Sequence, residues 1–164
     1  MNLEKLLWLG LTLVTLSASA QLVEDPDWKE TEVPPPPVFN KDKLVPIEMP
    51  KYVSLRFGVD PATLAITHDG ITRYVVVVVN TSGSINTAMY EGIRCATGEV
   101  KTYARYTADG KWLPIKEPQW RSLGANHPSK HALALASQGV CTDRTPTSSV
   151  PAIINILKNP QRGP

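Results

Sequence analysis

Few side chains in this sequence have the type and spacing of a reactive site. The histidines are His68, His127 and His131. His127 and His131 are four residues apart, but Pro128 between them opposes the helix that would bring their rings together, and a zinc site needs further ligands. Three serines lie beside no nucleophile motif: Ser82, Ser84 and Ser137. The sequence therefore predicts no catalytic residue, no metal site and no cofactor.

Glu91 is a carboxylate that strand alternation places on a face expected to be buried. An unpaired buried carboxylate is costly, which leaves three readings: an ion pair with Arg73, a strand-end position near solvent, or an acid in a site. Buried charges are normally paired. We therefore favour the pair with Arg73.

A β-hairpin must position these residues. Residues 90–95 and 100–106 alternate in character and flank Thr97 and Gly98, a short glycine-containing turn. With the turn centred there, Ile93 lies opposite Thr102 and Tyr90 opposite Arg105. Alternation then sorts the side chains into two faces. The core face carries Ile93, Cys95, Val100, Thr102, Ala104 and Tyr106.

The other face gathers cations and aromatic rings, and we call it the Tyr/Arg face. Asp109 and Gly110 indicate a second tight turn, which pairs Tyr106 with Leu113 and Ala104 with Ile115. This turn also places a tryptophan on the Tyr/Arg face. The complete set is Tyr90, Arg94, Lys101, Tyr103, Arg105 and Trp112.

The Tyr/Arg face has the chemistry of a binding surface. Arginine makes bidentate contacts to carboxylate or phosphate, and aromatic rings supply rigid apolar area. An anionic or carbohydrate-like envelope component, or an acidic patch on a partner protein, would suit it. Two structural readings stay open: cation–aromatic pairs that stabilise the sheet without a ligand, and burial of the face under the C-terminal helix.

The start of the chain is typical of an exported protein. Lys5 precedes an apolar segment at residues 6–16, and residues 18–20 fit the small-x-small cleavage pattern. We expect a signal peptide at residues 1–20, and no membrane span once it is removed. The apolar segment is short for a span, which needs about 20 residues. The formal charge of +2 is too small to indicate a nucleic-acid partner.

Residues 21–50 predict an extended, proline-rich arm. Residues 34–37 are all proline, which fixes φ and removes backbone donors. The arm is either a flexible tail, a rigid ligand for an aromatic groove of another protein, or a segment that docks in part on its own domain. We favour docking, because the arm carries Trp28, Phe39, Leu44, Val45 and Ile47.

Residues 51–160 predict a single α+β domain, mainly an antiparallel sheet built as a hairpin meander, with a C-terminal helix packed on it. Strands are expected near 52–59, 63–67, 71–79, 89–95, 99–107 and 111–115. Residues 74–79 lack a polar face and should form a central strand, and residues 80–86 should form a loop. Ser148 or Ser149 is a good cap for a helix at 150–158. The secondary structure of 117–145 stays open.

Two cysteines, Cys95 and Cys141, follow the expected signal peptide. In an oxidising compartment an isolated pair is more often a disulfide than a metal or redox site. The pair is not a C-x-x-C motif. We therefore expect a disulfide that joins the tail region to the hairpin.

The order of motifs resembles a known family. Residues 28–30 precede the proline-rich arm and residues 44–46, and stretches 57–61, 69–74 and 90–95 follow. Further along lie Tyr103, Ala104, Trp112, Trp120 and Cys141. This order resembles the CNP-like family of small exported bacterial envelope proteins, over about residues 28–141. The resemblance implies a periplasmic location in a Gram-negative cell and implies no activity.

Together these features predict a non-enzymatic periplasmic or cell-envelope protein. It would bind an envelope protein, a glycan or an anionic component through the Tyr/Arg face. The alternative is a periplasmic hydrolase with an unfamiliar site. Geometry separates the two, because a pocket lined by Glu91 and a histidine would favour the hydrolase, and an exposed Tyr/Arg face without a pocket would favour binding.

Overall fold

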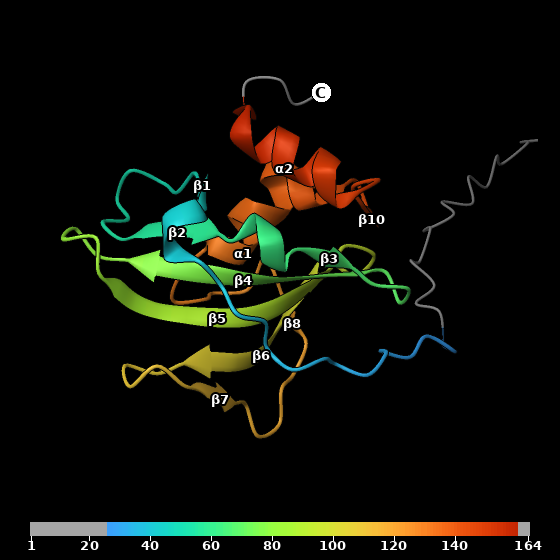
Figure 1. The fold of residues 1–164 in the computed structure, drawn as a ribbon. Coiled ribbons are helices and arrows are strands. Elements are labelled where there is room, and N and C mark those ends of the chain that lie inside the picture. The colour runs from blue at the N-terminus through green and yellow to red at the C-terminus, as the bar shows by residue number, and fades with distance from the viewer. Residues whose placement is uncertain (1–25, 161–164) are drawn as a thin grey trace, which may run out of the picture.

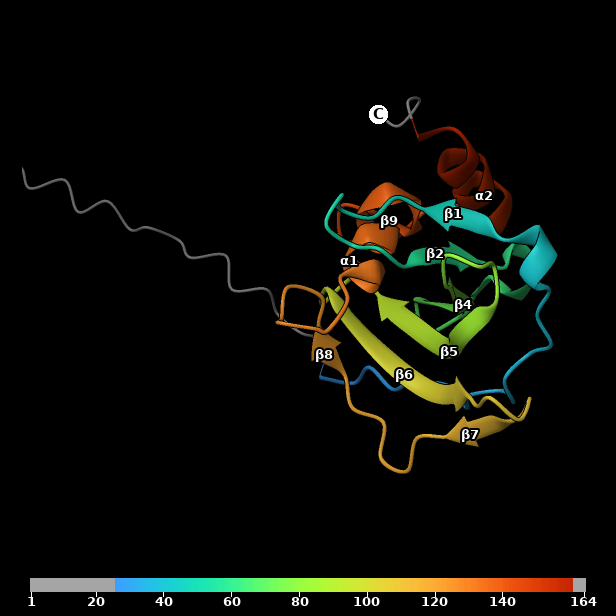
Figure 2. The same cartoon turned by 90° about the vertical axis from the view of Figure 1, so that its left-hand side faces the viewer.

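An antiparallel sheet with helices on one side and the N-terminal arm on the other forms the protein (Figures 1 and 2). The computed structural model describes residues 26–160. The expected signal peptide lies outside the described residues. The α+β class is confirmed, with one domain and a short C-terminal helix. Among the described residues, no helix is long and apolar enough to cross a membrane.

The sheet has eight strands, and its main path follows the order β1-β2-β4-β5-β6-β7. Strand β3 also pairs with β4, and β8 also pairs with β6. All pairs are antiparallel, as expected. The expected sequential order holds from β4 to β7, but not before it, because β2 and β3 both pair directly with β4. The strands are β1 (Val45–Ile47), β2 (Arg56–Val59), β3 (Ala65–Ile66), β4 (Ile71–Val79), β5 (Ile85–Arg94), β6 (Glu99–Tyr106), β7 (Trp112–Pro114) and β8 (Arg121–Ser122).

Strand β4 is the centre of the fold, as its valine run predicts. Val76 and Val78 belong to the core on the helical side, and Val75 and Val77 belong to a second cluster on the arm side. The following loop is shorter than expected, because β5 begins at Ile85. The side chain of Asn80 accepts hydrogen bonds from the backbone N–H groups of Ser82 and Ser84, both at 3.0 Å, and so closes a tight turn.

The β5–β6 hairpin has a different register from the predicted one. Ile93 lies opposite Val100, not Thr102. The connection is four residues long, 95–98, with Gly98 at φ 66°, so the pairing shifts by two residues. A shift of two keeps each side chain on its face, because strand side chains alternate with period two.

A β-bulge then changes the second half of β6. Glu91 pairs with Thr102 but Tyr90 pairs with Ala104, so Tyr103 is the extra residue. A bulge reverses the alternation beyond it. Tyr106 therefore joins the cluster on the arm side, and Arg105 lines a pocket on the helical side. The expectation that Arg105 shares the Tyr/Arg face is wrong for this reason.

The β6–β7 pairing also differs from the prediction by one residue. Tyr106 lies opposite Trp112, not Leu113, and Ala104 lies opposite Pro114. The N–H of Thr107 donates to the carbonyl of Lys111, which leaves a three-residue loop, 108–110. Such loops carry glycine in the left-handed region, and Gly110 has φ 82°.

The helical layer consists of α1 (His131–Leu135), the π-turn η3 (Ala136–Val140) and α2 (Val150–Lys158). The bounds of α2 are the predicted ones. Its cap is Ser149, whose side chain accepts a hydrogen bond from the N–H of Ala152, and Pro151 fits the first turn. Short elements complete the chain: η1 (Lys41–Lys43), η2 (Pro61–Thr63), β9 (Cys141–Thr142) and β10 (Thr145–Pro146).

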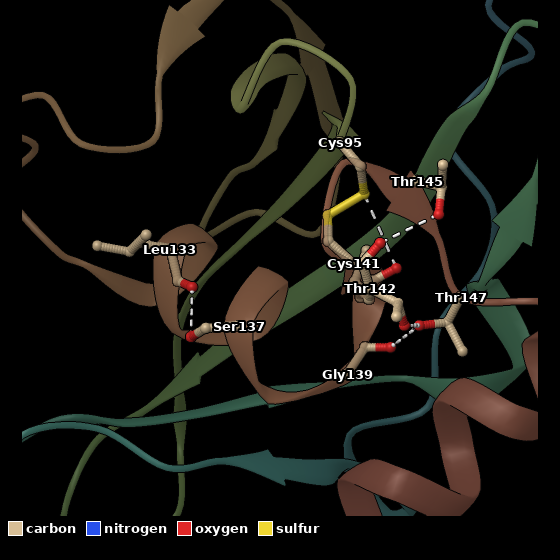
Figure 3. Close-up of a disulfide and its surroundings, with 9 residues drawn as sticks. Cys95, Leu133, Ser137, Gly139, Cys141, Thr142, Thr145 and Thr147 are labelled. Carbon is tan, nitrogen blue, oxygen red and sulfur yellow. Dashed lines mark hydrogen bonds between the residues drawn. A yellow bond between two sulfur atoms is a disulfide. The ribbon is translucent and has the colours of Figure 1, made fainter. Parts of the chain in front are cut away.

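Cys95 and Cys141 form the expected disulfide, with Cα atoms 5.7 Å apart (Figure 3). Cys95 begins the β5–β6 turn, and Cys141 directly follows η3 as the first residue of β9. The neighbouring Val140 is fully buried. The bridge therefore ties the segment that contains α1 and η3 to the end of the central hairpin.

Candidate functional site

The Tyr/Arg face is covered by the N-terminal arm. Tyr90, Arg94 and Tyr103 are only 2%, 6% and 7% exposed. The guanidinium of Arg94 lies 3.6 Å from the ring centroid of Trp28, and the indole N–H of Trp28 donates to the carbonyl of Asp69 at 2.9 Å. The expectation that the arm docks on its own domain is confirmed here. The C-terminal helix lies on the opposite side of the sheet.

Carboxylates meet the cations beneath the arm. Lys101 and the Tyr103 hydroxyl both donate to Glu30 of the arm, the latter at 2.7 Å. Burial and the Glu30 carboxylate raise the pKa of Tyr103 above its ordinary value, so this hydroxyl remains a donor. Arg73 pairs with Asp69 at 3.0 Å, and both side chains are 1% exposed. The face is thus a paired intramolecular interface.

Aromatic rings close the other end of this interface. Phe39 of the arm packs edge-on against Tyr106, at 5.0 Å between centroids, and against Trp112, at 5.9 Å. Five of the six predicted binding residues therefore lie together on the arm side: Tyr90, Arg94, Lys101, Tyr103 and Trp112. Their described contacts include Trp28, Glu30 and Phe39 of the arm, and also residues of the domain itself, such as Trp120 against Lys101 and Tyr106 against Trp112.

A pocket of about 500 Å³ opens on the other side of the sheet. It lies over β5 and β6, between the helical layer and the segment 115–129. Its buried lining is largely apolar and comprises Phe57, Val78, Met89 and Val100. Its exposed polar lining comprises Arg105, Glu117, Gln119 and Arg121. Such a concave, mainly apolar pocket with few polar groups is the usual form of a small-molecule site.

Glu91 and His131 meet in the lining of this pocket. His131 Nε2 lies 2.8 Å from Glu91 Oε2, and their side chains are 8% and 3% exposed. The hydroxyl of Tyr74 donates to the same carboxylate at 3.0 Å. The expected pairing of Glu91 with Arg73 is wrong, because the two side chains lie on opposite sides of the sheet.

The Glu91 carboxylate is held ionised by its neighbours. Burial alone would raise its pKa, but the charge and hydrogen bond of His131, with hydrogen bonds from Thr102 and Tyr74, outweigh burial and lower it. An ionised carboxylate only accepts hydrogen bonds. His131 Nε2 must therefore carry a proton in this contact. In the neutral ring, Nδ1 is then an acceptor.

Ser129 completes a chain of three side chains. Its Oγ lies 2.8 Å from His131 Nδ1, so in the neutral ring the serine hydroxyl donates to that nitrogen. The Phe57 ring stacks on one face of the imidazole, with 5.3 Å between the ring centroids and 7° between the ring planes. A hydroxyl, an imidazole and a buried carboxylate thus stand in line, and all three residues line the pocket.

Sequence patterns gave no sign of Ser129 as a site residue. Ser129 is two residues from His131 and lies in no nucleophile motif. Glu91, the carboxylate partner of His131, is 40 positions away from that histidine in the sequence. His127, which we considered for metal binding, also lines the pocket, and its Nε2 lies 2.6 Å from the carbonyl of Ser122. The part of the chain that the structure describes contains no cluster of His, Cys, Asp or Glu suited to a metal.

Comparison with known protein families gives a match over most of the chain. Residues 23–158 match the CNP1-like family. No curated protein and no solved structure matches the chain. The match spans the arm, the whole sheet and the helical layer, including Glu91, Ser129 and His131. On this match over most of its length, the chain belongs to the CNP1-like family.

Proposed function

We propose that this protein binds a small amphipathic anion in the pocket over β5 and β6. The observation that carries the proposal is the combination of apolar inner wall and unpaired cations at the edge. Among the described residues, the guanidinium groups of Arg105 and Arg121 have no hydrogen-bond or ion-pair partner, whereas the cations under the arm do. Guanidinium groups recognise carboxylate, phosphate and sulfonate oxygens.

The two arginines stand near opposite ends of the pocket. Arg121 of β8 lies opposite Val100 of β6. Val100 is five residues before Arg105 in the sequence, a separation of about 17 Å along a regular strand. A ligand that covers the apolar wall between them would present its acidic group to one of the two. This site replaces the Tyr/Arg face as the proposed binding surface, because the arm occupies that face.

Binding of matched dyes tests the proposal. We expect 1-anilinonaphthalene-8-sulfonate, an amphipathic anion, to bind the folded protein. The double variant Arg105→Gln with Arg121→Gln should weaken this binding about tenfold, since a hydrogen bond to a charged group contributes about 1.5 kcal/mol. N-phenyl-1-naphthylamine, which has the same rings without the sulfonate, should bind both proteins alike. Fluorescence titration at a temperature below the unfolding transition measures the affinity for each dye.

The matched control is Lys116→Gln, which removes a positive charge beside the pocket from a residue that does not line it. It should leave both dyes unaffected. Equal weakening by Lys116→Gln would show a general charge effect, and an unchanged affinity in the double arginine variant would reject the anion site.

We also propose that the chain acts in the periplasm of a Gram-negative cell after cleavage behind Ala20. The signal-like pattern of residues 1–20, the disulfide and the family support this location. The intact mass of protein released from the periplasm should correspond to a chain that starts at Gln21. Exported material that retains Met1 would contradict the cleavage.

A further inference from the structure

We infer that Ser129 is the nucleophile of an acyl-transfer site, with His131 as its general base and Glu91 as the residue that positions the imidazole. The inference rests on the proposed ligand pocket, because the substrate would be an ester of a molecule that this pocket holds. The expected reaction is hydrolysis of a carboxylic ester with an apolar, anionic body.

The three side chains meet the geometric requirements of an activated serine. A nucleophile needs a base within about 2.6–3.2 Å, and the base needs a third group that orients it. The contacts of 2.8 Å from Ser129 to His131 and 2.8 Å from His131 to Glu91 satisfy both. Such constellations are recognised by geometry and roles, not by chain order. Here Nδ1 faces the serine and Nε2 faces the carboxylate.

The surroundings hold the imidazole in one orientation. Phe57 stacks on the ring. The far oxygen of Glu91 accepts a hydrogen bond from Thr102 at 3.0 Å, and the near oxygen accepts one from Tyr74. The carboxylate therefore cannot rotate without breaking three contacts. Ser129 itself is only partly buried and lies in the pocket lining, where a ligand can reach it.

The reaction follows from these positions. Ser129 Oγ bonds to the acyl carbon of the ester while its proton passes to His131 Nδ1, and the resulting imidazolium faces the Glu91 carboxylate. The carbon–oxygen bond to the leaving alcohol then breaks, and His131 returns the proton to that oxygen. Water attacks the acyl-serine with His131 again as base, which releases the acid and restores Ser129.

A covalent probe tests this inference without a known substrate. Diisopropyl fluorophosphate forms a bond from phosphorus to an activated serine oxygen and releases fluoride. We expect one adduct on the folded wild-type protein, located at Ser129 by peptide mass spectrometry. Ser129→Ala should abolish it. The matched control Ser137→Ala removes a serine of η3 whose hydroxyl donates to the Leu133 carbonyl at 2.9 Å (Figure 3), and it should label like wild type.

His131→Gln separates activation from simple exposure. It should slow labelling at least about 100-fold, the usual contribution of a general base. If this variant does not fold, the labelling position in the wild-type chain remains decisive. A folded wild-type protein that gains no adduct at Ser129, or labels Ser129 and Ser137 at equal rates, would overturn the nucleophile. Ser129→Ala should still bind the anionic dye, because the dye does not depend on the serine hydroxyl. A wild-type protein that binds the dye but gains no adduct at Ser129 would reject catalysis alone and leave the proposed pocket intact.

Discussion

Replacing Asp69 by alanine is expected to lower the free energy of unfolding by about 3–5 kcal/mol. Removing one partner of a buried ion pair costs about that much, because the remaining charge loses its nearest counter-charge; Arg73 would keep only Glu30, at 3.7 Å. Asp69 and Arg73 are both 1% exposed and 3.0 Å apart. The same carboxylate accepts hydrogen bonds from the N–H and hydroxyl of Thr31, so the substitution also loosens the arm. Urea denaturation followed by circular dichroism measures the change.

Two comparisons make this result specific. Asp42→Ala breaks an exposed ion pair with Lys41 and should cost at most about 1 kcal/mol. Asp69→Asn keeps the shape but not the charge. Equal, small effects of Asp69→Ala and Asp42→Ala would show that the buried pair does not support the fold.

The pH dependence of stability provides an independent test of the Asp69 carboxylate. Burial alone would raise the pKa of Asp69, but hydrogen bonds from Thr67, Thr31 and Arg73 outweigh burial and hold it well below its ordinary value of 3.8. The folded-state pKa is thus the lower one, so the stabilisation is present above the unfolded pKa and is lost as pH falls through the folded value. Below about pH 4, wild type should lose stability more steeply than Asp69→Asn.

Removing the disulfide is expected to have the second large effect. The paired variant Cys95→Ser with Cys141→Ser should lose up to about 4 kcal/mol, the chain-entropy value for a loop of this length. The bridge closes 46 residues, and that loop contains the whole β6–β7 hairpin, α1 and η3. Denaturation of the wild-type protein with and without reductant should show the same loss, with the control that reductant leaves the serine variant unchanged.

Thiol titration checks the premise directly. Wild-type protein isolated without reductant and then denatured should contain no free thiol. Two reactive thiols per chain would contradict the bridge, and an unchanged denaturation midpoint after reduction would show that the bridge does not stabilise the fold.

Local signals in the sequence were sufficient to predict an element correctly where one physical preference dominated. The valine run of β4 allows no polar face, so a central strand is the only way to bury it. Ser149 and Pro151 define the start of α2, because the Ser149 side chain accepts a hydrogen bond from a free N–H of the first turn and Pro151 has no N–H that needs a partner there. The disulfide was predicted from an isolated cysteine pair in a chain whose first residues are expected to form an export signal.

The pairing registers of the β5–β6 and β6–β7 hairpins could be determined only from the three-dimensional structure. Gly98 and Gly110 marked both turns correctly, but a glycine does not determine whether a loop has two, three or four residues. The bulge at Tyr103 is linked to a close contact, because a Cβ on Gly92 would lie 2.6 Å from the Tyr103 hydroxyl. The bulge turns the Arg105 side chain toward the pocket. The alternation of side chains in the sequence does not reveal such a bulge.

The sequence by itself determined the antiparallel sheet with its main strands, the C-terminal helix, the disulfide and the docking of the arm, because each depends on short-range preferences or on the burial of apolar area. It did not determine β1, β8 or α1. Only the tertiary structure decided which polar groups meet. Arg94 stacks on Trp28 and Lys101 pairs with Glu30, and both partners belong to an arm about 70 residues away in the sequence. Glu91 has a histidine partner because α1 packs over β5. Charge pairing depends on distances of a few ångströms between segments remote in sequence, and periodicity does not encode such distances.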